Sequence, residues 1–264
     1  MSLDLPPTVR YEVRDRAGVL ILDRPKAKNA LSREMYAAVR DVARAVRTDP
    51  AVDALVLAGA GGAFAVGGDL KEMRAMLSGP DRSEILGYED HLPFEAVRQL
   101  PKPTIAVIDG LCMGGGLTLA LMCDMRIATE SSTFAIPEAR VGIVDGHLPR
   151  LLRDRVPPAV LRRWMYTGAP FSARDAWHNG LLSELADDAE DLQRRLGTLL
   201  TELSAASKPA IARLKGIFNE VMPLPSMSDA YDSLLNEEVL VHLKGFGANQ
   251  GAGTAAQPDG GTRA

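Results

Sequence analysis

The stretch "GLCMGGGLTLALMCD", residues 110–124, places three consecutive glycines directly before a run of strong helix formers. A helix that begins there leaves its first backbone N–H groups without partners and carries the positive end of its dipole at that point. Because glycine has no Cβ, another group can approach those N–H groups closely. The triplet therefore indicates either a helix packed tightly against a strand or a site where backbone N–H groups meet an anion.

Common glycine-rich motifs do not match this sequence. It contains no GxxxxGK[ST] phosphate loop, no GxGxxG dinucleotide fingerprint and no GxSxG nucleophile elbow. A second glycine-rich segment, "FAVGGDLKEM" at 64–73, also follows a predicted strand and leads into a helical pattern. Two such loops can converge on one oxygen atom, which is what an oxyanion hole requires.

The segments around these loops predict an α/β protein. Nearly continuous apolar runs at 52–59 and 102–110 are typical of buried strands, and two further strands are expected around a turn at Ala17-Gly18. Ser32 is a predicted N-cap, and another helix is expected over 84–99. The chain becomes mostly helical after Pro157. We expect a core over 1–200, a helical region over 201–245 and a disordered tail over 246–264.

Composition narrows the class of protein further. The 264 residues carry a net charge of -4 with no basic stripe, so nucleic acid is not an expected partner. Apolar runs are too short to span a bilayer, and the first residues do not resemble a secretion signal. Two cysteines and four scattered histidines form neither a disulfide framework nor a metal motif. We therefore expect a cytoplasmic protein without membrane association or bound metal.

Four segments together resemble the enoyl-CoA hydratase/isomerase (crotonase) superfamily in order and spacing. They are "RPKAKNALS" at 24–32, "FAVGGDLKEM" at 64–73, "KPTIAVIDGLCMGGGLTLALMCDMRIA" at 102–128 and "FAIPEARVGI" at 134–143. The resemblance implies a crotonase-like spiral of ββα turns with a C-terminal helical trimerisation region, assembled as a homotrimer or homohexamer. It also implies an acyl-CoA substrate and no separate cofactor, since coenzyme A is part of the substrate.

The resemblance assigns the two glycine loops to the thioester carbonyl. By motif position, the backbone N–H groups of Gly68 and Gly115 would form the oxyanion hole, which answers why glycines precede the helix. The acyl-CoA would also contact residues of the first two motifs and one residue of the third: Lys26, Ala27, Lys28, Asp69, Leu70, Lys71 and Thr118. For each lysine the alternative is a solvated surface side chain.

The acid/base residues depart from the family's hydratases, which use two glutamates. Glu138 matches the second of these, in "AIPEA", and partial burial there would raise its pKa; the alternative is a surface-turn glutamate. Thr118 stands where the first glutamate is expected, and a hydroxyl cannot accept a proton near pH 7 as a carboxylate can. A single glutamate is typical of the family's 3-enoyl to 2-enoyl isomerases. The sequence therefore predicts either an isomerase-like enzyme or an atypical hydratase.

The loop after "RVGI" is shorter than the family's usual Pro-Gly-Gly-rich loop. Asp145 falls one residue short of an aspartate that is essential in some relatives, and His147 follows two residues later. Either residue could supply the missing acid/base if the loop turns inward; the alternative is a surface Asp-Gly turn with a solvent-facing histidine. Other functions left open are a non-catalytic acyl-CoA-binding protein and an acyl-CoA hydrolase or C–C lyase that uses Asp145 or His147.

Overall fold

The computed structural model describes residues 3–78 and 93–221 of the chain, and it begins with a β-hairpin. Strands β1 (Val9–Arg14) and β2 (Ala17–Leu22) pair antiparallel. Their turn is formed by Asp15 (φ 46°) and Arg16 (φ 65°), so the prediction of a turn at Ala17-Gly18 is wrong. Gly18 instead belongs to β2, where a Cβ would lie only 2.7 Å from the hydroxyl of Tyr11. The glycine is needed for this close approach and not for a turn.

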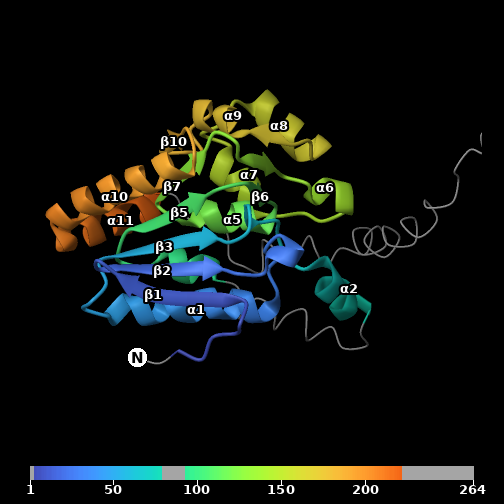
Figure 1. The fold of residues 1–264 in the computed structure, drawn as a ribbon. Helices are drawn as coiled ribbons and strands as arrows, with labels where there is room; N and C mark the ends of the chain where they lie inside the picture. The colour runs from blue at the N-terminus through green and yellow to red at the C-terminus, as the bar shows by residue number, and fades with distance from the viewer. Residues whose placement is uncertain (1–2, 79–92, 222–264) are drawn as a thin grey trace, which may run out of the picture.

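The strands form two sheets, and the chain passes repeatedly from one to the other. The larger sheet has the order β1-β2-β3-β5-β7-β10 and the smaller the order β4-β6-β8-β9. The remaining strands are β3 (Ala54–Gly59), β4 (Ala63–Ala65), β5 (Thr104–Ile108), β6 (Leu111–Met113), β7 (Met125–Thr129), β8 (Thr133–Ala135), β9 (Phe171–Ser172) and β10 (Glu184–Ala186). Each of β3, β5 and β7 is followed by a strand of the smaller sheet and then a helix, which confirms the predicted spiral of ββα turns (Figure 1).

Helices cover both faces of the larger sheet. Ser32 caps α1 (Arg33–Thr48) as predicted, accepting a hydrogen bond from the N–H of Met35 at 3.3 Å. Of the helix predicted over 84–99, the structure describes α4 (Phe94–Arg98), and residues 79–92 lie outside the described part. The other helical segments are η1 (Pro25–Ala27), α2 (Leu70–Ser78), α5 (Gly115–Met122), α6 (Glu138–Val141), α7 (His147–Leu152), α8 (Pro158–Thr167), α9 (Ala173–His178), α10 (Ala189–Ala205) and α11 (Lys208–Val221).

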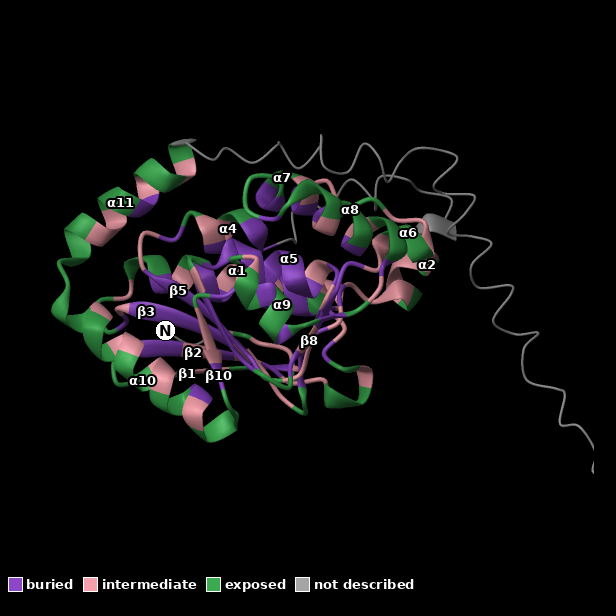
Figure 2. Ribbon diagram, turned by 90° about the horizontal axis from the view of Figure 1, so that it is seen from above, coloured by how far each residue is buried: buried purple, intermediate pink, exposed green. Residues whose placement is uncertain are grey.

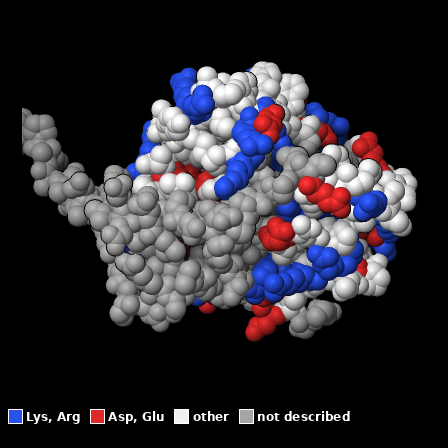
Figure 3. Space-filling view, turned by 180° about the vertical axis from the view of Figure 1, so that it is seen from behind, with Lys and Arg blue, Asp and Glu red and all other residues white. Residues whose placement is uncertain are grey.

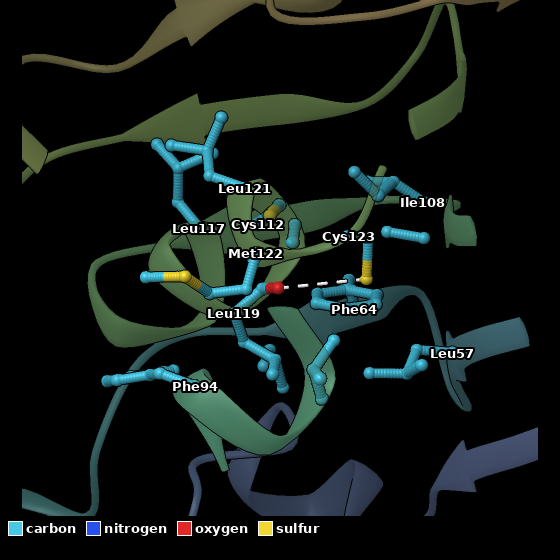
Figure 4. Close-up of a cluster of buried hydrophobic side chains, with 14 of the residues drawn as sticks. Leu57, Phe64, Phe94, Ile108, Cys112, Leu117, Leu119, Leu121, Met122 and Cys123 are labelled. Atoms are coloured by element: carbon cyan, nitrogen blue, oxygen red, sulfur yellow. Dashed lines mark hydrogen bonds between the residues drawn. The ribbon is translucent and has the colours of Figure 1, made fainter. Parts of the chain in front are cut away.

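Helix α5 is the centre of the core. Every residue from Gly116 to Met122 is buried, so the helix has no polar face and must be surrounded on all sides (Figure 2). Figure 4 shows its leucines packed with Phe64, Phe94 and the free thiols of Cys112 and Cys123. At the glycine triplet, helix α5 approaches the backbone of β4 closely, because a Cβ on Gly116 would lie 2.3 Å from the carbonyl oxygen of Ala65. Tight packing therefore accounts for part of the triplet.

Helix α10 covers the opposite face of the larger sheet. Val56 of β3 packs with leucines of α10, whereas Leu55 and Leu57, whose side chains point to the other face, belong to the main core. Residue 200 lies inside α10, so the predicted boundary between core and helical region divides a single helix. The helical region is described as far as residue 221, and the predicted tail over 246–264 lies outside the described residues. No helix in the described ranges is both long and apolar enough to cross a membrane.

Candidate active site

The candidate site lies at one edge of the smaller sheet. Its parallel strands β4, β6 and β8 are neighbours, and each is followed directly by one of the motifs singled out above. Gly68 comes after β4, Gly115 after β6 and Glu138 after β8. Because parallel strands end at the same edge, the topology brings these three positions together from segments far apart in the sequence.

The two glycine loops meet without side chains between them. A Cβ on Gly67, where φ is +102°, would lie 3.3 Å from the backbone nitrogen of Gly115. A Cβ on Gly115 would lie 3.6 Å from the backbone nitrogen of Gly68. Within the described part of the chain, neither the Gly68 N–H nor the Gly115 N–H donates a hydrogen bond. The two N–H groups are therefore neighbours and available to an acceptor from outside the chain.

The Gly68 loop is held by hydrogen bonds on either side of that glycine. The N–H of Leu31 donates to the Gly67 carbonyl at 2.8 Å, and the Asp69 N–H donates to the Leu31 carbonyl at 2.9 Å. Asp69 also accepts a hydrogen bond from Arg24 Nη1 at 2.7 Å and one from the Lys71 N–H at 2.9 Å. Burial opposes ionisation of Asp69, but these hydrogen bonds outweigh it and lower its pKa. Asp69 thus fixes the loop and the start of α2 through contacts within the protein.

The other residues of the first two motifs that are predicted to contact the acyl-CoA lie on the surface or at its edge. Lys26 and Ala27 belong to η1, and Lys28 follows it in a left-handed conformation with φ of 51°. Leu70 and Lys71 begin α2. Lys26, Lys28 and Lys71 are exposed. Exposure is expected both of lysines that bind a phosphate group and of solvated surface lysines, so both interpretations fit. On the face seen in Figure 3, basic and acidic side chains are interspersed.

Glu138 lies directly beside the glycine triplet. Its Oε1 is 2.7 Å from the position that a Cβ on Gly114 would take. Its Oε2 is buried and has no hydrogen-bond partner among the described residues. Burial, and secondly the negative charge of Asp145, raise the pKa of Glu138 to about 8. A surface-turn glutamate is therefore the wrong alternative; this carboxyl is buried and mostly protonated at neutral pH.

The shortened loop does turn inward, so the surface-turn alternative for Asp145 and His147 is also wrong. Asp145 Oδ2 accepts a hydrogen bond of 2.5 Å from the hydroxyl of Thr118, which is fully buried on α5. Asp145 Oδ1 accepts the N–H of His147 at 2.7 Å at the start of α7. The imidazole is buried too: its Nδ1 lies 3.4 Å from Asp145 Oδ1, and its ring meets Phe94 edge-on.

These contacts make the pKa values of the Glu138 and Asp145 carboxyl groups differ. Burial would raise the pKa of Asp145, but its contacts with His147 and Thr118 outweigh burial and lower it. Glu138 has a raised pKa and Asp145 a lowered one, so at pH 7 the pair carries one proton on Glu138 and one negative charge on Asp145. Carboxyl groups whose pKa values are moved apart are typical of acid/base sites.

Tyr36 is a site residue that sequence analysis did not single out. It is buried on α1, and its hydroxyl oxygen lies 2.8 Å from the position of a Cβ on Gly115. The only signal in the sequence was a hydroxyl-bearing side chain beside the apolar positions of an amphipathic helix. That pattern is also typical of ordinary core packing.

Alternating strands in two sheets, each ββ pair followed by a helix, define a crotonase-like fold, and it brings two glycine loops and a buried carboxyl together. The family model for enoyl-CoA hydratase/isomerase matches residues 14–237, and the chain belongs to this family. A crotonyl-CoA hydratase from Syntrophomonas wolfei is 32% identical over 80% of this chain and 81% of its own.

Two further comparisons place the chain within the family. A hydroxycinnamoyl-CoA hydratase-lyase from Pseudomonas fluorescens is 34% identical over 67% of this chain and 66% of its own. The crystal structure of an enoyl-CoA hydratase from Mycobacterium smegmatis superposes with a TM-score of 0.75 at 28% identity, covering 93% of this chain and 97% of that one. The chain is thus similar to enzymes that act on acyl-CoA thioesters, and the names of these relatives cover more than one reaction.

Proposed function

We propose that this family enzyme moves a proton between two carbon atoms of an unsaturated acyl-CoA, converting a 3-enoyl thioester to a 2-enoyl thioester. The observation that carries the proposal is the difference between its two buried carboxyl groups. Asp145 is occupied by hydrogen bonds from Thr118 and from the N-terminus of α7. Glu138 has an oxygen without a partner in the described part of the chain and lies against the glycine triplet. Glu138 is therefore the carboxyl suited to exchange a proton.

The proposed reaction uses the two glycine N–H groups and Glu138 in turn. The ionised carboxylate of Glu138 takes a proton from the carbon next to the thioester, and the electron pair moves onto the carbonyl oxygen. The Gly68 and Gly115 N–H groups stabilise that enolate oxygen, each by about 3 to 4 kcal/mol on the barrier. Glu138 then returns the proton two carbons further along the acyl chain. No electron is gained or lost, and we propose no cofactor besides the coenzyme A of the substrate.

Hydration is the second candidate, and the contact between Asp145 and Thr118 favours it. This contact brings a carboxylate next to the position where family hydratases have their first glutamate. In that reaction Asp145 would hold or activate water while the protonated Glu138 acts as acid.

A non-catalytic binding protein is disfavoured, because burying an unpartnered carboxyl costs free energy that simple binding does not require. A hydrolase or C–C lyase would likewise need Asp145 or His147 to activate water.

The test measures the purified full-length protein with crotonyl-CoA and with a 3-enoyl-CoA. Isomerisation of the 3-enoyl substrate without hydration of crotonyl-CoA supports the proposed proton shuttle. Robust hydration of crotonyl-CoA overturns it in favour of the second candidate. Tight binding of both thioesters without turnover would instead favour a binding protein.

Asp145→Asn is expected to move the pH profile of the isomerisation to lower pH. Activity requires ionised Glu138, so kcat/KM should rise with pH and level off above the pKa of about 8. Burial keeps that pKa high, but part of the shift comes from the charge of Asp145, which asparagine lacks. Asparagine can still accept the hydrogen bond from the His147 N–H. A midpoint that stays in place or moves upward would contradict the electrostatic coupling of the two side chains.

We propose that the protein associates through α11, in keeping with the trimer or hexamer predicted from the family resemblance. Leu214, Ile217 and Phe218 lie on one face of this helix and are 55%, 41% and 65% exposed. Lys215 points the other way, and its Nζ contacts Asp124 Oδ2 at 2.7 Å. The helix is thus fixed by an ion pair between buried Lys215 and exposed Asp124, with its apolar residues facing outward. Light scattering should give the mass of three or six chains; a monomer would contradict the proposal.

A further inference from the structure

Tyr36 brings a third polar group to the glycine site. Tyr36 is 3% exposed, and its ring packs edge-on against Phe94, with ring centroids 6.1 Å apart. The hydroxyl oxygen lies 2.8 Å from the position that a Cβ on Gly115 would take, and the Gly68 nitrogen lies 3.6 Å from the same position. The phenolic hydroxyl of Tyr36 and the Gly68 N–H, which donates no hydrogen bond within the described chain, therefore both lie near the Cβ position of Gly115.

The position of Tyr36 is tied to that of the Gly68 loop. Helix α1 begins directly after its cap Ser32, and the residue before the cap, Leu31, is hydrogen-bonded on both sides of Gly68. Tyr36 lies one helical turn further on, and its backbone N–H donates to the Ser32 carbonyl at 3.0 Å. The hydroxyl and the Gly68 N–H are thus held by the same short piece of chain, so their separation is fixed by the fold.

A tyrosine at this place differs chemically from any purely apolar residue. Its hydroxyl can donate one hydrogen bond to an oxygen on which negative charge develops, which an apolar side chain cannot do. Donors that are already oriented stabilise an oxyanion most when water is excluded, and the burial of the ring provides that exclusion. The remaining face of the site carries Glu138, and the negative charge of Asp145 behind it would repel an oxyanion rather than stabilise it.

We propose that the Tyr36 hydroxyl is a third hydrogen-bond donor to the thioester oxygen, alongside the Gly68 and Gly115 N–H groups. This inference rests on the proposed function, because it requires an acyl-CoA carbonyl between the two glycines. Tyr36 is a catalytic residue in this sense: it contacts the oxygen on which charge develops.

The experiment compares Tyr36→Phe with the wild-type protein, using Tyr11→Phe as a matched control. Tyr11 also has a hydroxyl close to a glycine, 2.7 Å from the Cβ position on Gly18, but it lies in the β1–β2 hairpin. The probe is butyryl-CoA with a ¹³C label at the carbonyl, which has no double bond to react. Isotope-edited infrared difference spectroscopy measures the carbonyl stretch of the bound thioester, and kcat/KM is measured with the 3-enoyl substrate.

Hydrogen-bond donors lower the stretching frequency of a carbonyl. We expect Tyr36→Phe to move the bound band partly back toward its frequency in water and to lower kcat/KM about tenfold, since two N–H donors remain. Tyr11→Phe should leave both unchanged. An unchanged band and rate in Tyr36→Phe would overturn the third donor while leaving the proposed function intact. A wild-type protein that neither binds butyryl-CoA nor shifts its band would overturn the proposed function itself.

Discussion

Glu138→Gln is expected to lower kcat/KM for isomerisation of a 3-enoyl-CoA by about 10³-fold while the protein stays folded. Glutamine has nearly the shape of the protonated carboxyl, so it fits beside Gly114, but it cannot accept or return a proton. The wild-type side chain is mostly neutral at pH 7, because its pKa is raised to about 8 by burial and by Asp145. The substitution therefore removes a proton carrier with little change in the charge of the folded site.

The same substitution should stabilise the folded protein, although it lowers the activity. A carboxyl with a folded-state pKa near 8 costs no stability below about pH 4.5, where folded and unfolded chains are both protonated. The cost grows as pH rises from 4.5 toward 8, because only the unfolded chain ionises freely. At pH 7 this difference is on the order of 3 kcal/mol. The melting temperature of Glu138→Gln should thus exceed that of the wild type at pH 8 and match it at pH 4.5.

The matched control for this prediction is Glu130→Gln. Glu130 lies eight residues earlier in the chain, is exposed and pairs with Arg174 on the surface. Surface ion pairs of this kind contribute about 0 to 1 kcal/mol, so both activity and melting temperature should stay near wild-type values. If Glu138→Gln retained more than a tenth of the wild-type kcat/KM, another group must carry the proton. Asp145 would then be the first to examine.

Local patterns in the sequence predicted the features of the fold that depend on neighbouring residues. The cap at Ser32 follows from a short polar side chain before an apolar helical repeat, and the buried strands β3 and β5 follow from continuous apolar runs. The turn at Asp15 and Arg16 was missed because Gly18, the expected turn residue, serves a cross-strand approach by Tyr11. Such an approach depends on the pairing of two strands and leaves no local signal.

For the candidate site too, only the features carried by local motifs were predictable from the sequence. Motif positions singled out Gly68, Gly115 and Glu138, and the structure brings these three residues to one edge of the smaller sheet. Their roles in binding and catalysis stay predictions. The inward turn of Asp145 was not predictable from its neighbours. It depends on Thr118, 27 residues earlier, and on Phe94, whose ring lies against His147. Side chains brought together by folding, Tyr36 among them, become candidates only when distances between separate segments are known.

Gly114→Ala is expected to lower kcat/KM by about 10²-fold, because two separate requirements for glycine meet at this residue. Its backbone has φ 52° and ψ -132°, a conformation that costs an L-residue about 1 to 3 kcal/mol. The added methyl group would also lie 2.7 Å from Glu138 Oε1 and displace the carboxyl. A displacement of about 1 Å at a reacting group can by itself cost about 10²-fold in rate.

Gly62→Ala separates the backbone strain from the displacement of Glu138. Gly62 has φ of +75°, so alanine is strained there too, but no atom lies within 4 Å of its Cβ position. Both variants should lower the melting temperature, and only Gly114→Ala should also lower kcat/KM.

The double variant of Gly114→Ala and Glu138→Gln should then be no slower than Glu138→Gln alone, because the methyl group acts on activity through that carboxyl. If Gly114→Ala slowed the reaction further in the Glu138→Gln background, the methyl group would be disturbing the neighbouring Gly115 N–H as well. Activity of Gly114→Ala at the level of Gly62→Ala would instead mean that Glu138 does not need its place beside the triplet, which is the contact on which the proposed proton shuttle depends.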